Sequence, residues 1–493
     1  MNKFAMMNNN FTMKNKWASP VIHCESFLSP GITINIITDE VSFLELQKVW
    51  DDVLLNSSAT IYQSFDWLFC WWKHFAVEQK YSLHIVTIYF SGKLIGAAPF
   101  FIHTHSVSGF RIFRRLRLIG CSLNSGKSDS NSLEEEGPSD YLDVISLKGF
   151  EETVSEALAL YLKDARYFFD EMDFQNVPEE SFVFKQVLPR LKKNGFELQL
   201  TKTDVCPKID VPSSLDDYLR SVSSSTRRRL KQSYSRIQND KDFSVEEIKC
   251  PDLSAALQNL KHLHQKRWNE LGYPGLFSDN RFERFQNEVC KSFFEKGWLW
   301  FKVIRFNNGI IASRLAFEFK GRIYDYLSGF DYSSDAASKR PGILLLLLMI
   351  KDAISKNLKT VDLLRGSEEY KFDLAASVSW NYRTVIFHPE QFNLLRLKLF
   401  SLLRLQALLM GRIRREKSIV KLFLKRSDIF LSASGYIKFC FQRLKSLLNR
   451  SFDNSNLRIR LPKVHGDNRG EQAEHIKREK IKDKKIHEAE VNV

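Results

Sequence analysis

Two hairpins of the same pattern, one in each half of the chain, most constrain the fold. In the first, apolar runs at 83–90 and 94–103 flank the turn Ser91-Gly92-Lys93. In the second, runs at 298–306 and 310–319 flank Asn307-Asn308-Gly309, and a third run follows at 322–330. A short loop with glycine between apolar runs is typical of a β-hairpin. Helical patterns surround both hairpins, which favours a duplicated α/β unit.

The order of the other expected elements divides the chain into two modules, 32–212 and 213–388. A larger set of helices and strands is expected from periodicity and turn residues. In the first module these are a strand at 32–38, helices at 40–55, 65–78, 151–166 and 180–194, and a basic strand at 111–119. In the second they are helices at 224–238, 252–271, 280–296 and 342–356, and strands at 360–364 and 383–387. The polar stretch 124–139 is predicted to be a mobile loop.

Composition points to a cytoplasmic protein that holds no metal. No apolar run reaches the roughly 18 residues of a membrane-spanning helix, and the first residues lack the apolar core of a secretory signal. The seven cysteines are scattered and never occur as a Cys-x-x-Cys pair, which argues against a disulfide framework and a zinc site.

The positive charge of the chain is concentrated near its C-terminus. Of the net charge of +15, residues 389–450 contribute +11, from 14 Lys and Arg against 3 Asp and Glu. Leu/Phe and Arg/Lys faces alternate there, which predicts a basic amphipathic helical appendage. Such a helix can lie peripherally on the anionic inner membrane, or it can pack on the body or on a partner. Residues 1–31 and 451–493 are expected to be a disordered lead and tail.

Three segments of the second module carry candidate site residues. The first is the start of the helix at 342, where Lys339, Arg340 and Gly342 precede or open the helix. Free backbone N–H groups and the helix dipole favour phosphate binding there, and glycine lets a ligand approach the backbone. The competing interpretation is an ordinary helix cap with two solvated cations.

The second segment follows the strand at 360–364. Its charged residues, Asp362, Arg365, Glu368 and Lys371, occur where the chain leaves the strand, and ligands of α/β sheets bind beyond the carboxyl ends of strands. A carboxylate held near Arg and Lys could orient an amine or hydroxyl and accept its proton. A structural network of ion pairs remains the alternative.

The third segment is a basic helix start. Arg227 and Arg228 follow a run of serines that can cap a helix, so they could hold a phosphate or an anionic acceptor. A solvated basic face explains the same pattern.

Several motifs between 62 and 388 together resemble the BioF2-like acetyltransferase family of GNAT-type proteins, found in cellulose and exopolysaccharide biosynthesis and related to Fem aminoacyltransferases. The most specific is Asp-x-x-Arg-Gly-x-Glu-x-Tyr-Lys, which Asp362, Arg365, Gly366, Glu368, Tyr370 and Lys371 match. Supporting matches in the family's order are YQSFDWLFCWW, LIGAAPFF, SSSTRRRLKQSYSRI, LHQKRW, IIASRLAF, YDYLSGFD and RPG.

The resemblance implies tandem GNAT-like modules, α/β with mixed sheets flanked by helices. It also implies transfer of an acyl group from acetyl-CoA or another acyl-CoA to an amine or hydroxyl. The acceptor would be a sugar-like or lipid-linked precursor of the envelope or of an exopolysaccharide.

In that reaction Glu368, or else Asp362, would deprotonate the acceptor, and Tyr370 would protonate the leaving thiolate. Arg365 and Lys371 would hold an anionic group, and Lys339, Arg340 and Gly342 would bind the pyrophosphate of the donor. Two alternatives stay open: a Fem-like enzyme that uses aminoacyl-tRNA, and a non-catalytic scaffold at the membrane. A tRNA usually meets a large basic face, and residues 1–388 are nearly neutral.

Overall fold

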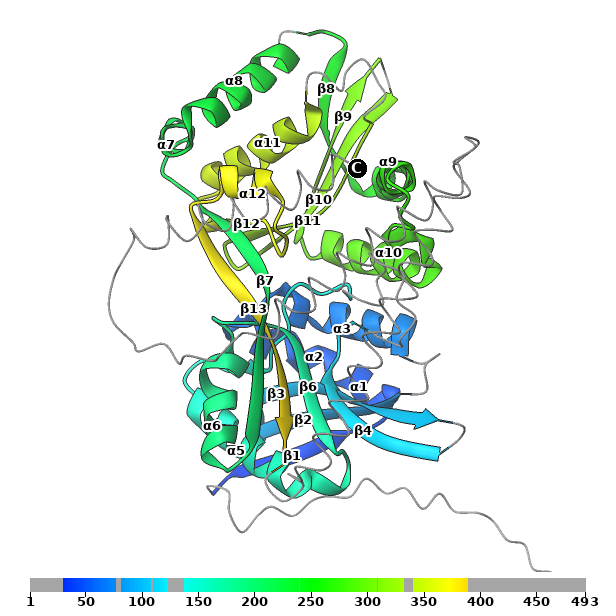
Figure 1. Cartoon of the computed structure of the whole chain (residues 1–493), viewed down its shortest axis with the longest axis vertical. Coiled ribbons are helices and arrows are strands. Elements are labelled where there is room, and N and C mark those ends of the chain that lie inside the picture. The colour runs from blue at the N-terminus through cyan, green and yellow to red at the C-terminus, as the bar shows by residue number, and fades with distance from the viewer. Residues whose placement is uncertain are drawn as a thin grey trace, which may run out of the picture. The chain divides into compact units, whose positions relative to one another are not determined.

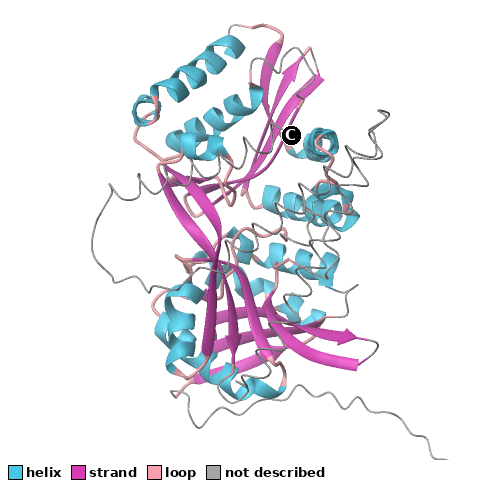
Figure 2. Cartoon of the chain, in the orientation of Figure 1, coloured by secondary structure: helices cyan, strands magenta, loops and turns pink. Residues whose placement is uncertain are grey.

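The described strands form a single mixed sheet. The computed structural model describes residues 30–76, 81–107, 110–122, 137–238, 240–307, 309–331 and 340–388. Thirteen strands in this part of the chain pair in the order β1-β2-β3-β4-β6-β13-β7-β12-β11-β10-β9-β8, with β5 on β3 (Figures 1 and 2). Helices cover the sheet, so the fold is the predicted mixed α/β type.

Each half contributes an antiparallel meander that ends in a parallel pair. The first consists of β1 (Ile32–Ile37), β2 (Ser82–Phe90), β3 (Lys93–Val107), β4 (Phe110–Leu118), β5 (Ile145–Ser146) and β6 (Glu171–Pro178), with β4 and β6 parallel. The second consists of β8 (Phe243–Glu247), β9 (Leu299–Phe306), β10 (Gly309–Phe319), β11 (Arg322–Phe330) and β12 (Thr360–Asp362), with β11 and β12 parallel.

The two long strands at the centre of the sheet connect the halves. β7 (Glu197–Asp210) follows the first meander in sequence but pairs with β12 of the second. β13 (Ser377–Phe387) ends the second half but pairs with β6 of the first, and β7 and β13 are antiparallel neighbours. The described residues of both halves accordingly belong to one compact unit. The predicted module boundary after 212 falls between β7 and the next helix.

Helices of the first half are short, except for the 14-residue α5. They are α1 (Glu40–Glu45), α2 (Gln47–Leu55), α3 (Phe65–Trp71), α5 (Glu151–Asp164) and α6 (Leu188–Lys193), with single turns at Ile61–Gln63, Trp72–Ala76, Ala165–Tyr167 and Val183–Val187. Side chains cap two of them: Asp39 accepts from the Ser42 N–H at 2.9 Å, and Ser64 accepts from the Trp67 N–H at 3.4 Å. Such caps satisfy N–H groups that the first turn leaves free.

The second half places helices on both faces of its strands. They are α7 (Leu215–Ser221), α8 (Ser224–Gln238), α9 (Leu253–Glu270), α10 (Asn280–Glu295), α11 (Pro341–Ser355) and α12 (Glu369–Leu374), with single turns at Cys250–Asp252 and Leu276–Ser278. Alternation along β10 explains the two layers, because Ala316 joins the core under α7 and α11 while Leu315 and Phe317 join the core under α9 and α10. Figure 1 shows α7, α8 and α11 opposite α9 and α10.

The structure confirms most expected elements and corrects several lengths. The expected helix at 40–55 breaks at Leu46, and the expected strand at 360–364 ends at Asp362. Leu364 adopts φ of +59°, which lies outside the β region, so the extended chain is interrupted there. The 14-residue strand β7 had no counterpart among the elements expected from the sequence.

The appendage 389–450, the tail 451–493 and nearly all of the lead 1–31 and of the loop 124–139 lie outside the described residues. Within the described ranges, none of the helices is both long and apolar enough to cross a membrane.

Candidate functional site

The site begins where the parallel strands β11 and β12 part. They pair from Arg322 opposite Thr360 to Tyr324 opposite Asp362, and β12 ends there, whereas β11 continues to Phe330. Its register with β10 shifts at this point, which leaves Tyr326 as the extra residue of a β-bulge. Among the described residues, no strand pairs with this edge of β11 beyond Tyr324. The edge therefore has backbone groups available to an extended ligand.

Asp362 is fully buried at the point where the strands part. Its Oδ1 accepts hydrogen bonds from the Tyr141 hydroxyl at 2.8 Å and from the Leu364 N–H at 3.0 Å, while Oδ2 has no partner among the described residues. Burial raises the pKa of Asp362, although nearby Lys208 and the Tyr141 hydrogen bond oppose the rise. A carboxyl group of this kind can exchange a proton closer to neutral pH than an exposed one.

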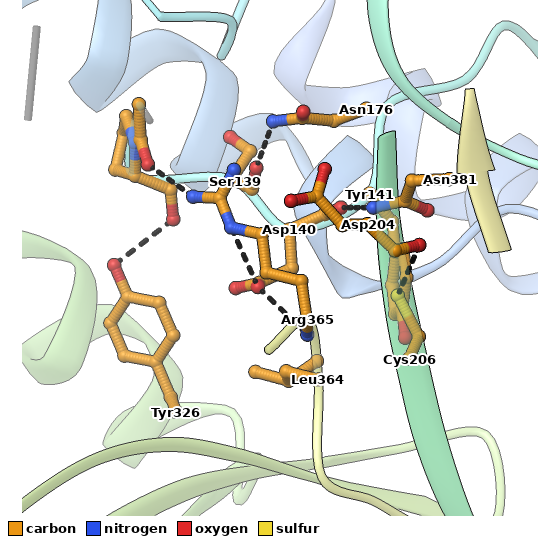
Figure 3. Close-up of polar contacts among 12 residues, drawn as sticks. Ser139, Asp140, Tyr141, Asn176, Asp204, Cys206, Tyr326, Leu364, Arg365 and Asn381 are labelled. Carbon is orange, nitrogen blue, oxygen red and sulfur yellow. Dashed lines mark hydrogen bonds and ion pairs between the residues drawn. The ribbon is translucent and has the colours of Figure 1, made fainter. Parts of the chain in front are cut away.

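Arg365 connects the chain after β12 to a segment of the first half, residues 137–144, which we call the central segment. Its Nε lies 3.2 Å from Asp140 Oδ1, and its Nη2 donates to the Gly137 carbonyl at 2.8 Å (Figure 3). The Tyr62 hydroxyl donates to the other oxygen of Asp140 at 3.2 Å. Burial raises the pKa of Asp140 despite the charges of Arg365 and Lys371. Two buried carboxyl groups therefore come from different halves of the sequence.

Side chains from both halves hold the central segment from several directions. The Tyr326 hydroxyl donates to the Pro138 carbonyl at 3.1 Å, which brings the β-bulge against the segment (Figure 3). Amide side chains donate to the carbonyls of three successive residues: Asn176 to Ser139 at 2.9 Å, Asn381 to Asp140 at 2.8 Å and Gln63 to Tyr141 at 2.9 Å. This many hydrogen bonds fix the position of Asp140 and Tyr141.

The structure separates the predicted charged cluster into a buried and an exposed part. The Glu368 side chain is 55% exposed and lies 3.1 Å from the ammonium of buried Lys371, which also donates to the Arg365 carbonyl at 2.7 Å. Burial alone would lower the pKa of Lys371, but the Glu368 carboxylate raises it above its usual value. Tyr370 is partly exposed, and burial followed by the charge of Asp325 raises its pKa. Both predicted anion-binding cations are thus already engaged within the protein.

Gly366 is the residue that allows the chain to pass under this ion pair. It has φ of +139°, and a Cβ atom there would overlap the Glu368 carboxylate and lie 2.6 Å from Lys371 Nζ. Gly366→Ala should lower the free energy of unfolding by more than about 1 kcal/mol, measured by urea denaturation. Gly92→Ala is the matched control, because Gly92 has φ of +80° but no heavy atom near its Cβ position. Equal losses in both variants would contradict a role for the contact with the ion pair.

The predicted phosphate-binding residues meet the end of β11. α11 begins at Pro341, and exposed Arg340 precedes it at φ of +55° without a side-chain cap. A Cβ atom on Gly342 would lie 2.7 Å from the Phe330 ring, so this glycine has a packing role besides the predicted one. Lys339 lies outside the described residues. Because Phe330 ends β11, the start of α11 adjoins the far end of the unpaired edge.

The predicted basic helix start is present, but it is the third arginine that reaches α12, two residues beyond the motif. Arg227 donates to the carbonyls of Arg220 at 3.4 Å and Val222 at 3.3 Å, and Arg228 is exposed. Neither makes a hydrogen bond or ion pair with 362–371 among the described residues. Arg229 instead lies 2.9 Å from Asp373 of α12.

Four residues of this site were not predicted from the sequence: Tyr62, Asp140, Tyr141 and Tyr326. A usable signal was present, because Gly137-Pro138-Ser139-Asp140-Tyr141 ends the polar loop with a turn and two functional side chains. Tyr326 lies within the motif YDYLSGFD, where alternation predicted an ordinary strand residue. No group of three His, Cys, Asp or Glu side chains in the described part could hold a metal ion.

Comparison with known proteins gives a family match within the second half. Residues 224–372 match the family model of the acetyltransferase (GNAT) domain, from α8 to α12. No curated protein matches the chain in sequence.

Among solved structures, FemX is 10% identical over 71% of this chain and 96% of its own, with a TM-score of 0.47. The C-terminal domain of a putative lysylphosphatidylglycerol synthetase from Agrobacterium fabrum is 11% identical over 70% of this chain and 92% of its own, with a TM-score of 0.43. A tandem GNAT protein from the clavulanic acid biosynthesis pathway is 10% identical over 71% of this chain and 98% of its own, with a TM-score of 0.36. These likenesses are too distant to support an argument about activity.

The family match covers the parting strands, α11 and the Asp-x-x-Arg-Gly motif, which are the elements that build the site. Residues 224–372 therefore match a GNAT acetyltransferase domain, and this match makes the protein a transferase.

Proposed function

We propose that the protein transfers an acyl group from acyl-CoA to an amine or hydroxyl of a sugar-like or lipid-linked precursor. The observation that carries the proposal is the unpaired edge of β11, which runs from Asp362 at one end to the start of α11 at the other. The family match supports acyl transfer, and the motif resemblance supports the acceptor class.

The donor fits this edge by its chemistry. The amide groups of its extended arm can pair with the backbone of β11 beyond Tyr324, where no strand of the described part pairs, as an added strand would. Its pyrophosphate then lies at the start of α11, where the helix dipole favours an anion. Pro341 has no N–H, so Gly342 offers the first backbone donor of the helix, and Arg340 and Lys339 add positive charge.

Asp362 is the better candidate for the general base, ahead of Glu368. The acceptor attacks the thioester carbonyl directly, the C–S bond breaks, and the acceptor's proton passes to a carboxylate. Buried Asp362 has one free oxygen and a raised pKa, whereas Glu368 is exposed and paired with Lys371. Tyr370 is the proposed proton donor to the leaving thiolate. Arg365 and Lys371 then act by holding the site together, since their charged groups face Asp140 and Glu368.

The rest of the proposal concerns location and donor type. A cytoplasmic enzyme in peripheral contact with the inner membrane through 389–450 would have access to a lipid-linked acceptor. The use of aminoacyl-tRNA in place of acyl-CoA is the competing function, and donor binding distinguishes the two. The acetyltransferase match disfavours the non-catalytic scaffold.

Donor binding tests the proposal most directly. Acetyl-CoA, longer acyl-CoAs and free CoA should bind the full-length protein in calorimetry. The double variant Lys339→Ala/Arg340→Ala should weaken binding about tenfold or more, because two positive charges near the pyrophosphate are lost. Lys351→Ala is the matched control, since Lys351 lies on α11 away from its start. Absence of binding by every CoA species would contradict the proposal and favour aminoacyl-tRNA.

A further inference from the structure

Both halves contain a pair of parallel strands that part, and within the described ranges a chain segment fills the opening of the first half but not that of the second. In the first half, β4 and β6 pair at Arg115 with Glu171 and at Leu116 with Met172. Beyond these positions β4 leads into Gly120, and β6 continues to Pro178. The parallel pairing of β11 and β12 is similarly short, but there the first strand of the pair, β11, continues and the second, β12, ends.

The central segment occupies the opening of the first half. On one side, the Leu142 N–H donates to the Asn176 carbonyl of β6 at 2.8 Å. On the other side it packs on the turn after β4, where a Cβ atom on Gly120 would lie 2.6 Å from Ser139 Oγ and 2.8 Å from Leu142 Cδ2. The segment thus pairs with one strand and contacts the exit of the other. An extended ligand would have to compete with this segment for the edge of β6.

We propose that the first half binds no acyl donor and instead contributes Tyr141 as a positioning residue of the second half, so that both halves build one catalytic centre. The proposal rests on the proposed function, in which Asp362 is the base. The central segment closes the first opening and directs the Tyr141 hydroxyl to Asp362 Oδ1 at 2.8 Å. This hydrogen bond orients the carboxyl group and leaves Oδ2 for the acceptor.

The groups that face Asp362 define what Tyr141 controls. β7 presents Lys208 and Cys206, β11 presents Arg322 and Tyr324, and Tyr62 lies on the other side of Tyr141. Lys208 donates to Glu180 at 2.9 Å and acts on Asp362 through its charge. Tyr141 donates the side-chain hydrogen bond that favours the ionised carboxylate. Its loss would raise the pKa of Asp362 further, because the charged form loses more than the neutral form.

The pH dependence of the rate in Tyr141→Phe tests the positioning role. Asp362 must be ionised to accept a proton, so the rate falls as the pH falls through its pKa. In the variant this acidic limb should move up by about one pH unit, which corresponds to a roughly tenfold lower rate on that limb. The KM for the donor should stay within about twofold, since Tyr141 does not face the proposed phosphate site.

Tyr62→Phe is the matched control. It also removes a buried tyrosine hydroxyl of the same cluster, but one that donates to Asp140 rather than to Asp362. The acidic limb of its pH–rate profile should lie at the same pH as in the unmodified protein. An unshifted limb in Tyr141→Phe, or an equal shift in both variants, would overturn the positioning role.

The number of donor molecules bound per chain tests the other part of the inference, that the first half binds no acyl donor, and needs no variant. Calorimetry of the full-length protein with acetyl-CoA should give one site per chain, and two sites would overturn the inference. The proposed function fails separately: if Asp362→Asn retains full activity, Asp362 is not the base, while the number of donor sites still decides whether the first half binds a donor.

Discussion

Asp362→Asn is expected to lower kcat by about 10²–10⁴-fold, because the amide cannot accept the proton of the attacking group. Asparagine keeps the size of the side chain and can still accept from Tyr141 and from the Leu364 N–H. Donor affinity should therefore change little. Steady-state kinetics give the fall in kcat, and calorimetry with acetyl-CoA shows whether binding persists.

Glu368→Gln is the comparison for this prediction. Glu368 belongs to the same motif, but its side chain is 55% exposed and its partner is Lys371. If Asp362 is the base, the glutamine variant should keep most of its turnover, and the asparagine variant should also lose the acidic limb of the pH profile. A severe loss in Glu368→Gln with an active Asp362→Asn would assign the base to Glu368 instead.

Arg365→Met is expected to lower the free energy of unfolding by about 3–5 kcal/mol, because it leaves a buried carboxylate without its charged partner. The Arg365 guanidinium contacts Asp140 and the Gly137 carbonyl. The Arg365 side chain is 15% exposed and that of Asp140 is 9% exposed. Methionine retains the apolar stem of the side chain. Urea denaturation with linear extrapolation measures the loss.

The pH dependence of that loss has a defined sign. Burial already raises the pKa of Asp140, and removal of Arg365 raises it further, so the folded variant binds a proton more tightly than the unfolded chain. The free energy of unfolding of the variant should then fall as the pH rises from the pKa of Asp140 in the unfolded chain to its pKa in the folded variant. The loss of stability relative to the unmodified protein should be smallest at acidic pH. The double variant Arg365→Met/Asp140→Asn should recover part of the loss at neutral pH. No recovery would show that Arg365 stabilises the fold through other contacts.

Local pattern was sufficient to predict most elements of both halves. Turns at Ser91-Gly92 and Asn307 have the positive φ angles that hairpins require, and they join β2 to β3 and β9 to β10 as expected. α8 has the predicted bounds of 224–238, and α11 begins one residue before the predicted start. Each of these features is determined by residues close together in the sequence, such as a turn residue, a capping residue or a periodic run of apolar residues. The motif after β12 was found for the same reason, since its residues are contiguous.

Tertiary structure alone decided which of these residues form the site. Asp362 and Glu368 are equivalent carboxylates in the sequence, but β12 ends in the core between β7 and β11, whereas Glu368 precedes a surface helix. Asp140 and Tyr141 are more than 220 positions from Arg365 and Asp362, and only the packing of the central segment between β4 and β6 brings them together. Periodicity reports burial along one element, and it contains no information about which distant loop meets a strand end. The exchange of β7 and β13 between the halves, which creates that meeting, is a long-range pairing that no local pattern encodes.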